Sequence, residues 1–362
     1  MGASEASRRS GHTKARADDA ADEAPRGAPW RSLGSLLGLG MLLLGAAMVA
    51  AVLFGAEPTS LQEALRAPST DRTIILHVRL PRVLLAAMAG GGLGLVGGAF
   101  QALLRNPLAE PYVLGVSGGA ALGATVVIAL GISAVGWLGA AVVPLAALLG
   151  GLGSTALVYA VAKRTPRGPA GASILLAGVM VNSIASALIT FLKTLAPPSR
   201  TAQLVRWLVG VIELPSTISL LAMSAYVVAG CAVLLRDAGR MNLLALGDES
   251  AQLLGVDVGS LERRVFLAAS CVVGAIVSLT GLIGFVGLVV PHAVRRLCGP
   301  DHRRLLPLSM LAGGGMLVVC DLVARAAFVP LGTEPPVGAV TALIGGPVFL
   351  VMLMRTPRSE LG

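Results

Sequence analysis

Long apolar segments, separated by short polar ones, fill the sequence from residue 33 onward. Ten of them have roughly 17–25 residues, the length that an α-helix needs to cross the hydrocarbon core of a bilayer. We predict membrane-spanning helices at about 33–55, 83–104, 113–131, 135–161, 171–194, 217–235, 264–279, 281–296, 305–328 and 337–354. The seventh and eighth segments are short and nearly merge at Thr280-Gly281.

Polar stretches frame this apolar region. Residues 1–31 are mixed in charge and poor in aliphatic side chains, which is typical of a disordered tail. They are too long and too acidic for the short basic start of a signal peptide. We therefore predict a cytoplasmic tail at 1–31, a transmembrane domain at 32–356 and a short cytoplasmic tail at 357–362, with the longest inner loop at about 242–262.

The basic residues indicate the orientation. An even number of spans places both tails on the same side of the membrane. With the tails inside, 20 of the 28 Lys and Arg residues lie on the inner side, as expected because positive charge favours the cytoplasmic side. The sequence thus predicts an all-α polytopic protein of the cell membrane, with about ten transmembrane helices and both termini in the cytoplasm.

Composition supports this prediction. Hydrophobic residues make up 55% of the chain and charged residues only 13%, whereas a soluble domain has about 25% charged residues. The net charge of +9 lies in tails and loops, and no basic stripe interleaved with aromatic residues indicates nucleic-acid binding. The cysteines are scattered and form no CxxC pair, so they are interpreted as small buried residues: Cys231, Cys271, Cys298 and Cys320.

Residues 92–97 match GxGxxG but lie inside an apolar span without a preceding strand, so a dinucleotide site is not predicted. Gly90, Gly94 and Gly98 instead recur every four residues and predict a face on which another helix packs closely.

Residues 115–119 match the GxSxG pattern of hydrolases. A serine nucleophile requires a base within hydrogen-bond reach, but no histidine of this chain falls at mid-membrane depth. Ser117 is instead expected to bond to the backbone or to cap the third helix. No lysine follows a glycine, so the P-loop pattern is absent from this sequence, and any ATP hydrolysis belongs to another chain.

Five segments contain more polar and turn residues than lipid-facing loops require: RLPR (79–82), QALLRNPLAEPYVLGVSGG (101–119), LGDESAQLLG (246–255), GLIGFVGLVVPHAVRR (281–296) and DLVARAAFVPLGTEPPVG (321–338). In composition and order they resemble the FecCD-type membrane subunits of ABC importers for iron siderophores, haem and cobalamin. The resemblance covers about residues 60–355 and implies a permease with the fold of type II ABC importers.

The resemblance also implies partners. A second permease copy or a similar chain would complete a dimeric pathway, two cytoplasmic ATPase subunits would use ATP-Mg, and an extracytoplasmic binding protein would deliver the cargo. The permease itself would be a transport subunit without catalytic activity or a bound cofactor. We expect an iron-siderophore cargo, with haem or cobalamin as the alternative. A secondary transporter driven by an ion gradient is the rival hypothesis, and Asp321 is the one clear acid near a span interior.

Three arginines on the predicted outer side, Arg79, Arg82 and Arg325, oppose the positive-inside tendency. They therefore need a structural partner or a function. Arg325 can pair with Asp321 one helical turn away. The resemblance implies that all three receive carboxylates of the binding protein, which suits the forked guanidinium group.

The inner loop contains a short piece that is compatible with a helix. Two acids at its start suit a helix N-terminus, and the glycine after it suits a helix end. An ordinary interfacial helix is one interpretation; the resemblance implies a coupling helix that docks on the ATPase. The predicted coupling residues are Leu246, Gly247, Asp248, Glu249, Ala251, Leu254 and Gly255.

The inner turn between the second and third spans contains Asn106, Pro107, Glu110 and Pro111, which break both helices. It is predicted either as a rigid turn or as a second ATPase contact.

Possible pathway residues are Gln101, Asn182 and Ser183, although Asn182 equally suits a bond to a neighbouring helix. The predicted spans hold no cluster of His, Cys or carboxylates that would bind a bare metal ion, so no metal site is predicted. This pattern fits a cargo whose metal is already chelated.

Overall fold

The computed structural model describes residues 33–57, 59–66, 69–112, 115–132, 139–164 and 170–354. The chain divides into two compact units, Met1–Leu36 and Leu37–Gly362. All contacts discussed below lie within the second unit. The predicted tails at 1–31 and 357–362 lie outside the described residues.

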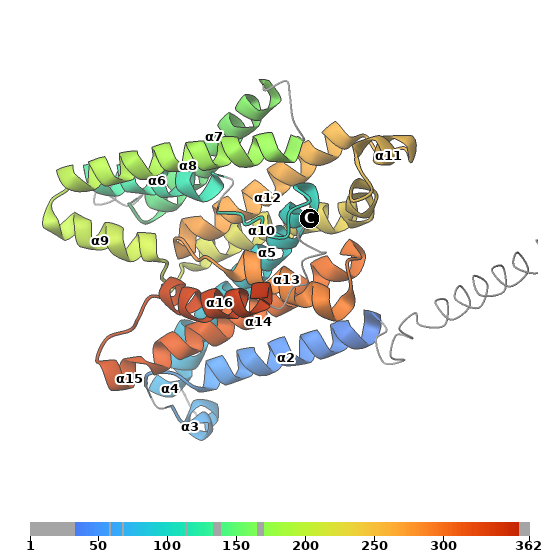
Figure 1. Ribbon diagram of the computed structural model, residues 1–362. Coiled ribbons are helices and arrows are strands. Elements are labelled where there is room, and N and C mark those ends of the chain that lie inside the picture. The colour runs from blue at the N-terminus through green and yellow to red at the C-terminus, as the bar shows by residue number, and fades with distance from the viewer. Residues whose placement is uncertain are drawn as a thin grey trace, which may run out of the picture. The chain divides into compact units, whose positions relative to one another are not determined.

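The secondary structure of the described residues is helical (Figure 1). The longer helices are α2 (Leu33–Leu53), α5 (Leu80–Leu103), α6 (Val116–Leu130), α7 (Gly139–Arg164), α8 (Ala170–Leu195), α9 (Pro198–Val209), α10 (Thr217–Leu244), α12 (Val258–Thr280), α13 (Val286–Cys298), α14 (His302–Ala326) and α16 (Val337–Met354). The shorter ones are α3 (Leu61–Arg66), α4 (Thr70–Thr73), the π-helix η1 (Ile74–Arg79), α11 (Asp248–Leu253) and α15 (Phe328–Leu331).

Each of the ten predicted spans corresponds to one helix in the described part of the chain. Seven helices are long and apolar enough to cross a membrane, namely those containing α2, α5, α7, α8, α10, α12 and α14. The other three, α6, α13 and α16, are shorter. All ten predicted transmembrane segments are thus helices in the described part of the chain, and seven of them have the length and composition of a full span, whereas α6, α13 and α16 are shorter.

The boundary between the seventh and eighth spans lies where the sequence predicted it. α12 ends at Thr280, and Gly281 follows with a φ of 65°, a conformation that glycine adopts without steric cost. Phe285 directly precedes α13 and has a φ of 69°, which is rare for a residue with a side chain. The chain is thus held in an irregular conformation between the two helices.

Short helices mark the two ends of the bundle. Figure 1 shows α9, α15 and α4 at one end and α11 at the other. With the cytoplasmic termini predicted from charge, α11 lies on the cytoplasmic side and α9, α15 and α4 lie on the outer side. The short helices α3, α4, α9 and α15 were not predicted from the sequence, because they are too short or too polar to resemble spans.

α5 packs against α10, α12, α13 and α14 and forms the centre of the core. A Cβ atom at Gly90 would overlap the carbonyl oxygen of Gly313 in α14, and one at Gly98 would come within 2.9 Å of Leu306 Cδ2. At Gly94 it would overlap the carbonyl oxygen of Ser309. The predicted glycine face is therefore confirmed as the surface that lets α14 approach the α5 backbone.

Candidate functional site

At the outer end, two buried arginines bind the C-terminal end of α2. Arg79 donates hydrogen bonds to the carbonyl oxygens of Val52 (3.1 Å) and Leu53 (2.8 Å). Arg325 donates to the carbonyl oxygens of Ala51 (2.9 Å) and Phe54 (3.3 Å). The last carbonyl groups of a helix have no partner within the helix and carry partial negative charge, so cations stabilise this end.

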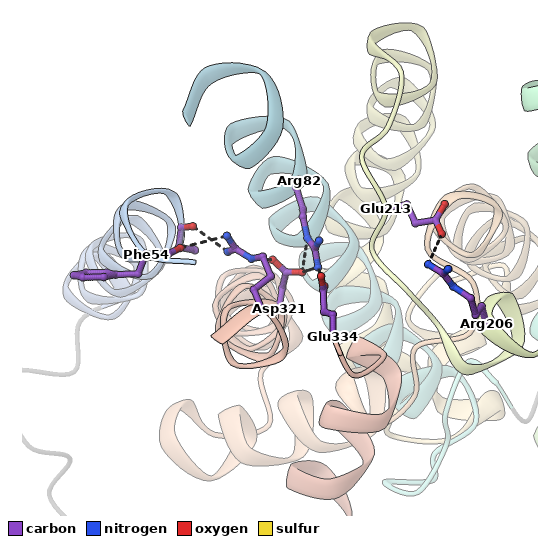
Figure 2. A network of polar contacts seen from close by, with 8 residues as sticks. Phe54, Arg82, Arg206, Glu213, Asp321 and Glu334 are labelled. Atoms are coloured by element: carbon purple, nitrogen blue, oxygen red, sulfur yellow. Dashed lines mark hydrogen bonds and ion pairs between the residues drawn. The ribbon is translucent and has the colours of Figure 1, made fainter. Parts of the chain in front are cut away.

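Asp321 links Arg325 to the third arginine of this end, Arg82. It is fully buried and accepts a hydrogen bond from Arg325 Nε (2.9 Å) and another from Arg82 Nε (2.9 Å). The i,i+4 pair predicted for Arg325 is confirmed. Arg82 also pairs with Glu334, and Figure 2 shows Arg82 between Asp321 and Glu334. The cost of burying a carboxylate is offset because two guanidinium groups bind it.

The arginines of this outer cluster therefore find their hydrogen-bond acceptors within the chain itself. Arg79 and Arg325 are 5% and 6% exposed, and their donors contact helix-end carbonyls and Asp321. The Arg82 side chain is 15% exposed and the Glu334 side chain 34%. Of the three predicted docking residues, Arg82 is thus the most exposed, and docking stays a prediction.

At the cytoplasmic end, α11 presents leucines to solvent. Leu253 is 89% exposed and Leu254 is 57% exposed, whereas Ala251 is fully buried against its own chain. Glycines bound the helix on both sides, with a φ of 106° at Gly247 and 83° at Gly255. The predicted short helix and its glycine stop are present in the structure.

An ion pair ties α11 to the end of α5. Arg105, which follows the C-cap residue of α5, donates to the carbonyl oxygen of Leu244 (3.0 Å) and pairs with Asp248, the first residue of α11. Sequence reasoning missed this role of Arg105, because the two charges are 143 positions apart. Both side chains remain partly exposed, so the pair positions α11 more than it stabilises the fold.

The predicted inner turn has two parts. Asn106 Oδ1 accepts from the Leu108 backbone N–H (2.9 Å), which forms a tight local turn beside Arg105. Beyond it the chain turns back into the protein. Glu110 accepts a hydrogen bond from the Phe285 N–H (2.9 Å), and Tyr112 accepts one from the Ile283 N–H.

These two side chains satisfy the irregular backbone between α12 and α13, which explains how non-helical chain is tolerated at this position. Pro107 lies in the turn, and Pro111 is buried against Gly287, where a Cβ would come within 2.9 Å of the proline ring. The segment is thus a rigid structural turn. ATPase contact remains a prediction for its exposed first part.

The cytoplasmic ends of α10 and α14 are joined by a polar cluster that the sequence did not reveal. Asn242 donates to Asp301 Oδ1 (2.6 Å), and Asp301 also caps α14 by accepting from the Arg303 N–H (3.0 Å). These bonds favour the charged carboxylate and lower the pKa of Asp301, the bond from Asn242 being the largest cause.

The three predicted pathway residues lie in different surroundings. Gln101 is buried, donates to the Leu288 carbonyl oxygen (3.3 Å) and accepts from Arg295 (3.1 Å). Ser183 is exposed on α8 and bonds back to the Val179 carbonyl oxygen (2.9 Å). Asn182 lines a cavity of about 330 Å³ between α6, α8 and α9.

Ser117 lines the same cavity. The expectation that its hydroxyl bonds to the backbone or caps the third helix is wrong, because Ser117 Oγ has no hydrogen-bond partner. The reason is local: Gly115 occupies the N-cap position with a φ of 86°. Ser117 therefore falls inside the first helical turn, beyond the position from which a side chain caps.

Comparisons with known proteins agree with the fold. The chain matches the FecCD transport family over residues 42–355. It is 44% identical over 287 residues to the cobalamin import system permease protein BtuC of Halobacterium salinarum, covering 79% of this chain and 74% of that protein. It is 35% identical over 329 residues to the hemin transport system permease protein HmuU of Yersinia pestis, covering 90% and 97%.

A solved inward-facing structure of an ABC transporter of the metal-chelate type superposes with a TM-score of 0.79. The identity is 30%, and the match covers 89% of this chain and all of that one. The family match, the relatives and the helical fold with its membrane-spanning helices lead to one conclusion: this chain belongs to the FecCD transport family and is a multi-pass membrane permease of an ABC importer.

Proposed function

We propose that this permease forms, with a second copy or a similar chain, the pathway through which a preassembled metal chelate is imported, with ferric siderophore as the first cargo to test. The observation that carries the proposal is the exposed leucine surface of α11, held on the end of α5 by Arg105. In this family context the surface provides the contact for cytoplasmic ATPase subunits. A binding protein would deliver cargo at the outer end, near Arg82.

A cobalamin cargo is the second candidate. The observation that favours it is the 44% identity to a permease named for cobalamin import. Haem is kept in the test because a relative with 35% identity is named for hemin transport.

The rival hypothesis of an ion-coupled transporter loses its main support in the structure. Asp321, the acid that it would use, is bound by Arg82 and Arg325. A carboxylate held by two cations is poorly suited to bind a coupling cation.

Deletion of the gene, followed by side-by-side uptake of labelled ferric siderophore, haem and cobalamin, tests the cargo. Loss of uptake of one cargo, restored by the intact gene, identifies it. Uptake should persist when the proton gradient is collapsed and cease when ATP is depleted. Normal uptake of all three cargoes in the deletion strain would refute the cargo assignment.

Replacing the exposed leucines tests the ATPase contact. The double variant Leu253→Asp, Leu254→Asp places two charges on a surface that must be apolar to bury against a partner, which costs several kcal/mol of binding free energy. We expect the ATPase to be lost from the purified complex while the amount of permease in the membrane is unchanged.

Leu214→Asp is the matched control, because Leu214 is 52% exposed but precedes α10 at the outer end. Retention of the ATPase by the α11 double variant would contradict the contact.

A further inference from the structure

The cavity between α6, α8 and α9 has a mixed polar and apolar lining with one charged wall residue. Its volume is about 330 Å³. Its polar lining is Tyr112, Ser117, Asn182, Ser186, Thr190 and Lys193. Among the described residues that line it, the ammonium group of Lys193 is the only formal charge. The cavity therefore has a positive potential without a lining carboxylate to neutralise it.

The polar lining from α8 forms a stripe. Asn182, Ser186, Thr190 and Lys193 recur every three or four residues and so lie along one face of the helix. Exposed apolar side chains such as Ile184 occupy other positions on the same helix. A polar stripe on a membrane helix is costly in contact with lipid, so this arrangement indicates that the face meets water or a polar ligand.

α6 supplies a second, independent feature. Ser117 is 2% exposed, lines the cavity, and its hydroxyl has no hydrogen-bond partner. A buried hydroxyl without a partner is unfavourable in a protein interior, and a ligand atom that accepts its hydrogen bond would remove this cost. Ser117 and Gly118 also belong to the first turn of α6, where free backbone N–H groups and the helix dipole favour an anion.

We propose that this cavity is a binding subsite for an anionic oxygen group of the cargo, a carboxylate or a phosphate, with Lys193 as the residue that determines charge specificity. The proposal rests on the import function proposed above and narrows its cargo to chelates that carry an anionic oxygen group. The hydroxyl of Ser117 and the first turn of α6, which packs at Asn182, supply hydrogen-bond donors to the group. Lys193 lies about 16 Å further along α8 and supplies positive charge at the other end of the cavity. Cargo with exposed carboxylates or a phosphodiester would be favoured over an uncharged chelate.

The charge preference is measured directly with a cysteine reporter, without any need for transport. The four native cysteines are replaced by alanine and Ser186→Cys is introduced into the full chain, assembled with its ATPase in lipid nanodiscs. The rates of modification by an anionic and by a cationic methanethiosulfonate reagent are then compared. Residue 193 lies seven positions beyond residue 186 on α8, about 10 Å along the helix, and a charge at that separation in a water-filled site changes each rate about twofold.

We expect the ratio of anionic to cationic rates to fall about two- to fourfold when Lys193→Gln is added. Lys193→Arg should preserve the ratio, and Lys163→Gln, at the far end of α7, should not change it. A second reporter, Ser219→Cys in α10, should not respond to Lys193→Gln. An unreactive Ser186→Cys, or a ratio unaffected by Lys193→Gln, would overturn the proposal.

Protection of the reporter identifies the ligand chemistry. Haem carries carboxylates, cobalamin a phosphodiester, and a ferric trihydroxamate serves as the uncharged chelate. Slower modification with haem or with cobalamin, lost in Lys193→Gln, supports the subsite and names the oxygen group. Equal protection by the uncharged chelate overturns it. A failure of the proposed import function can be told apart from a failure of the subsite. If the protein does not import these cargoes, ATP-dependent uptake is absent in every variant, but the reporter ratios are unchanged.

Discussion

At the scale of single residues, the three arginines of the outer cluster differ in how strongly each one is bound into the fold. Arg79 and Arg325 are buried and hold the end of α2. Replacing either leaves backbone carbonyls without a donor, which costs about 1–3 kcal/mol for each buried group. Loss of uptake in an Arg79 variant would thus report on folding as well as on docking, and Arg82 is the better residue with which to test docking.

Glu334 competes for Arg82 with any carboxylate that arrives from outside. Glu334→Gln leaves the Arg82 guanidinium with Asp321 alone and makes the surface more positive by one charge. We expect the binding protein to bind the permease about two- to fivefold more tightly, since partly exposed ion pairs are worth up to about 1 kcal/mol. Binding kinetics on nanodisc-embedded permease would measure the change.

The matched control for this experiment is Glu213→Gln. Glu213 pairs with Arg206 at 3.4 Å, and both side chains are about 70% exposed. Figure 2 shows this pair apart from Arg82, Asp321 and Glu334. It should leave the affinity unchanged, whereas Arg82→Gln should weaken binding. An affinity that responds to none of the three changes would place docking elsewhere.

At the scale of elements, close helix contact depends on particular glycines and not on glycine content. Gly313 and Gly315 both lie in α14, and alanine at either gains helix propensity. A Cβ at Gly313 would overlap the Gly90 carbonyl oxygen, whereas one at Gly315 would meet no atom within 4 Å.

Gly313→Ala is therefore expected to destabilise the protein by about 1–3 kcal/mol through overpacking, and Gly315→Ala to be neutral or stabilising. Thermal unfolding of the two purified variants in the same detergent would show this difference. Equal Tm values would mean that α5 and α14 are free to separate.

At the scale of the whole molecule, α5 connects the outer arginine cluster to the cytoplasmic helix α11, the two surfaces proposed for the binding protein and the ATPase. Arg82 lies in the first turn of α5, and Arg105 follows two residues after the last residue of this helix, Leu103. A helix of 24 residues is about 36 Å long and is stiff because four other helices surround it. We therefore expect a displacement at one end of α5 to reach α11 through the pair of Arg105 with Asp248.

Arg105→Gln tests this connection. The ATPase should stay bound, because the leucines of α11 are intact, but ATP-dependent uptake should fall several-fold because α11 is no longer fixed to α5. Arg240→Gln is the control, since Asp237 keeps its bond to Arg264 at 3.0 Å. Full uptake by the Arg105 variant would show that α11 moves the spans by another route.

The sequence predicted those features that depend on neighbours in the chain. The ten helices follow from the length that a bilayer demands, the Asp321–Arg325 pair from i,i+4 spacing, and the glycine face from its four-residue repeat. It did not predict the pair of Arg82 and Glu334, which are 252 positions apart. The cavity at Ser117 was missed for the same reason, since tertiary packing of three separate helices creates it.

The shortness of α13 has a consequence for how this protein is made. Its 13 residues extend about 20 Å, against a hydrocarbon core of about 30 Å. As the ribosome delivers it, α13 is too short to be released sideways into lipid as an independent segment. The irregular stretch before it is satisfied by Glu110 and Tyr112, which were synthesised much earlier. Stable integration of α13 therefore depends on segments made before it, because their packing supplies the partners that lipid cannot.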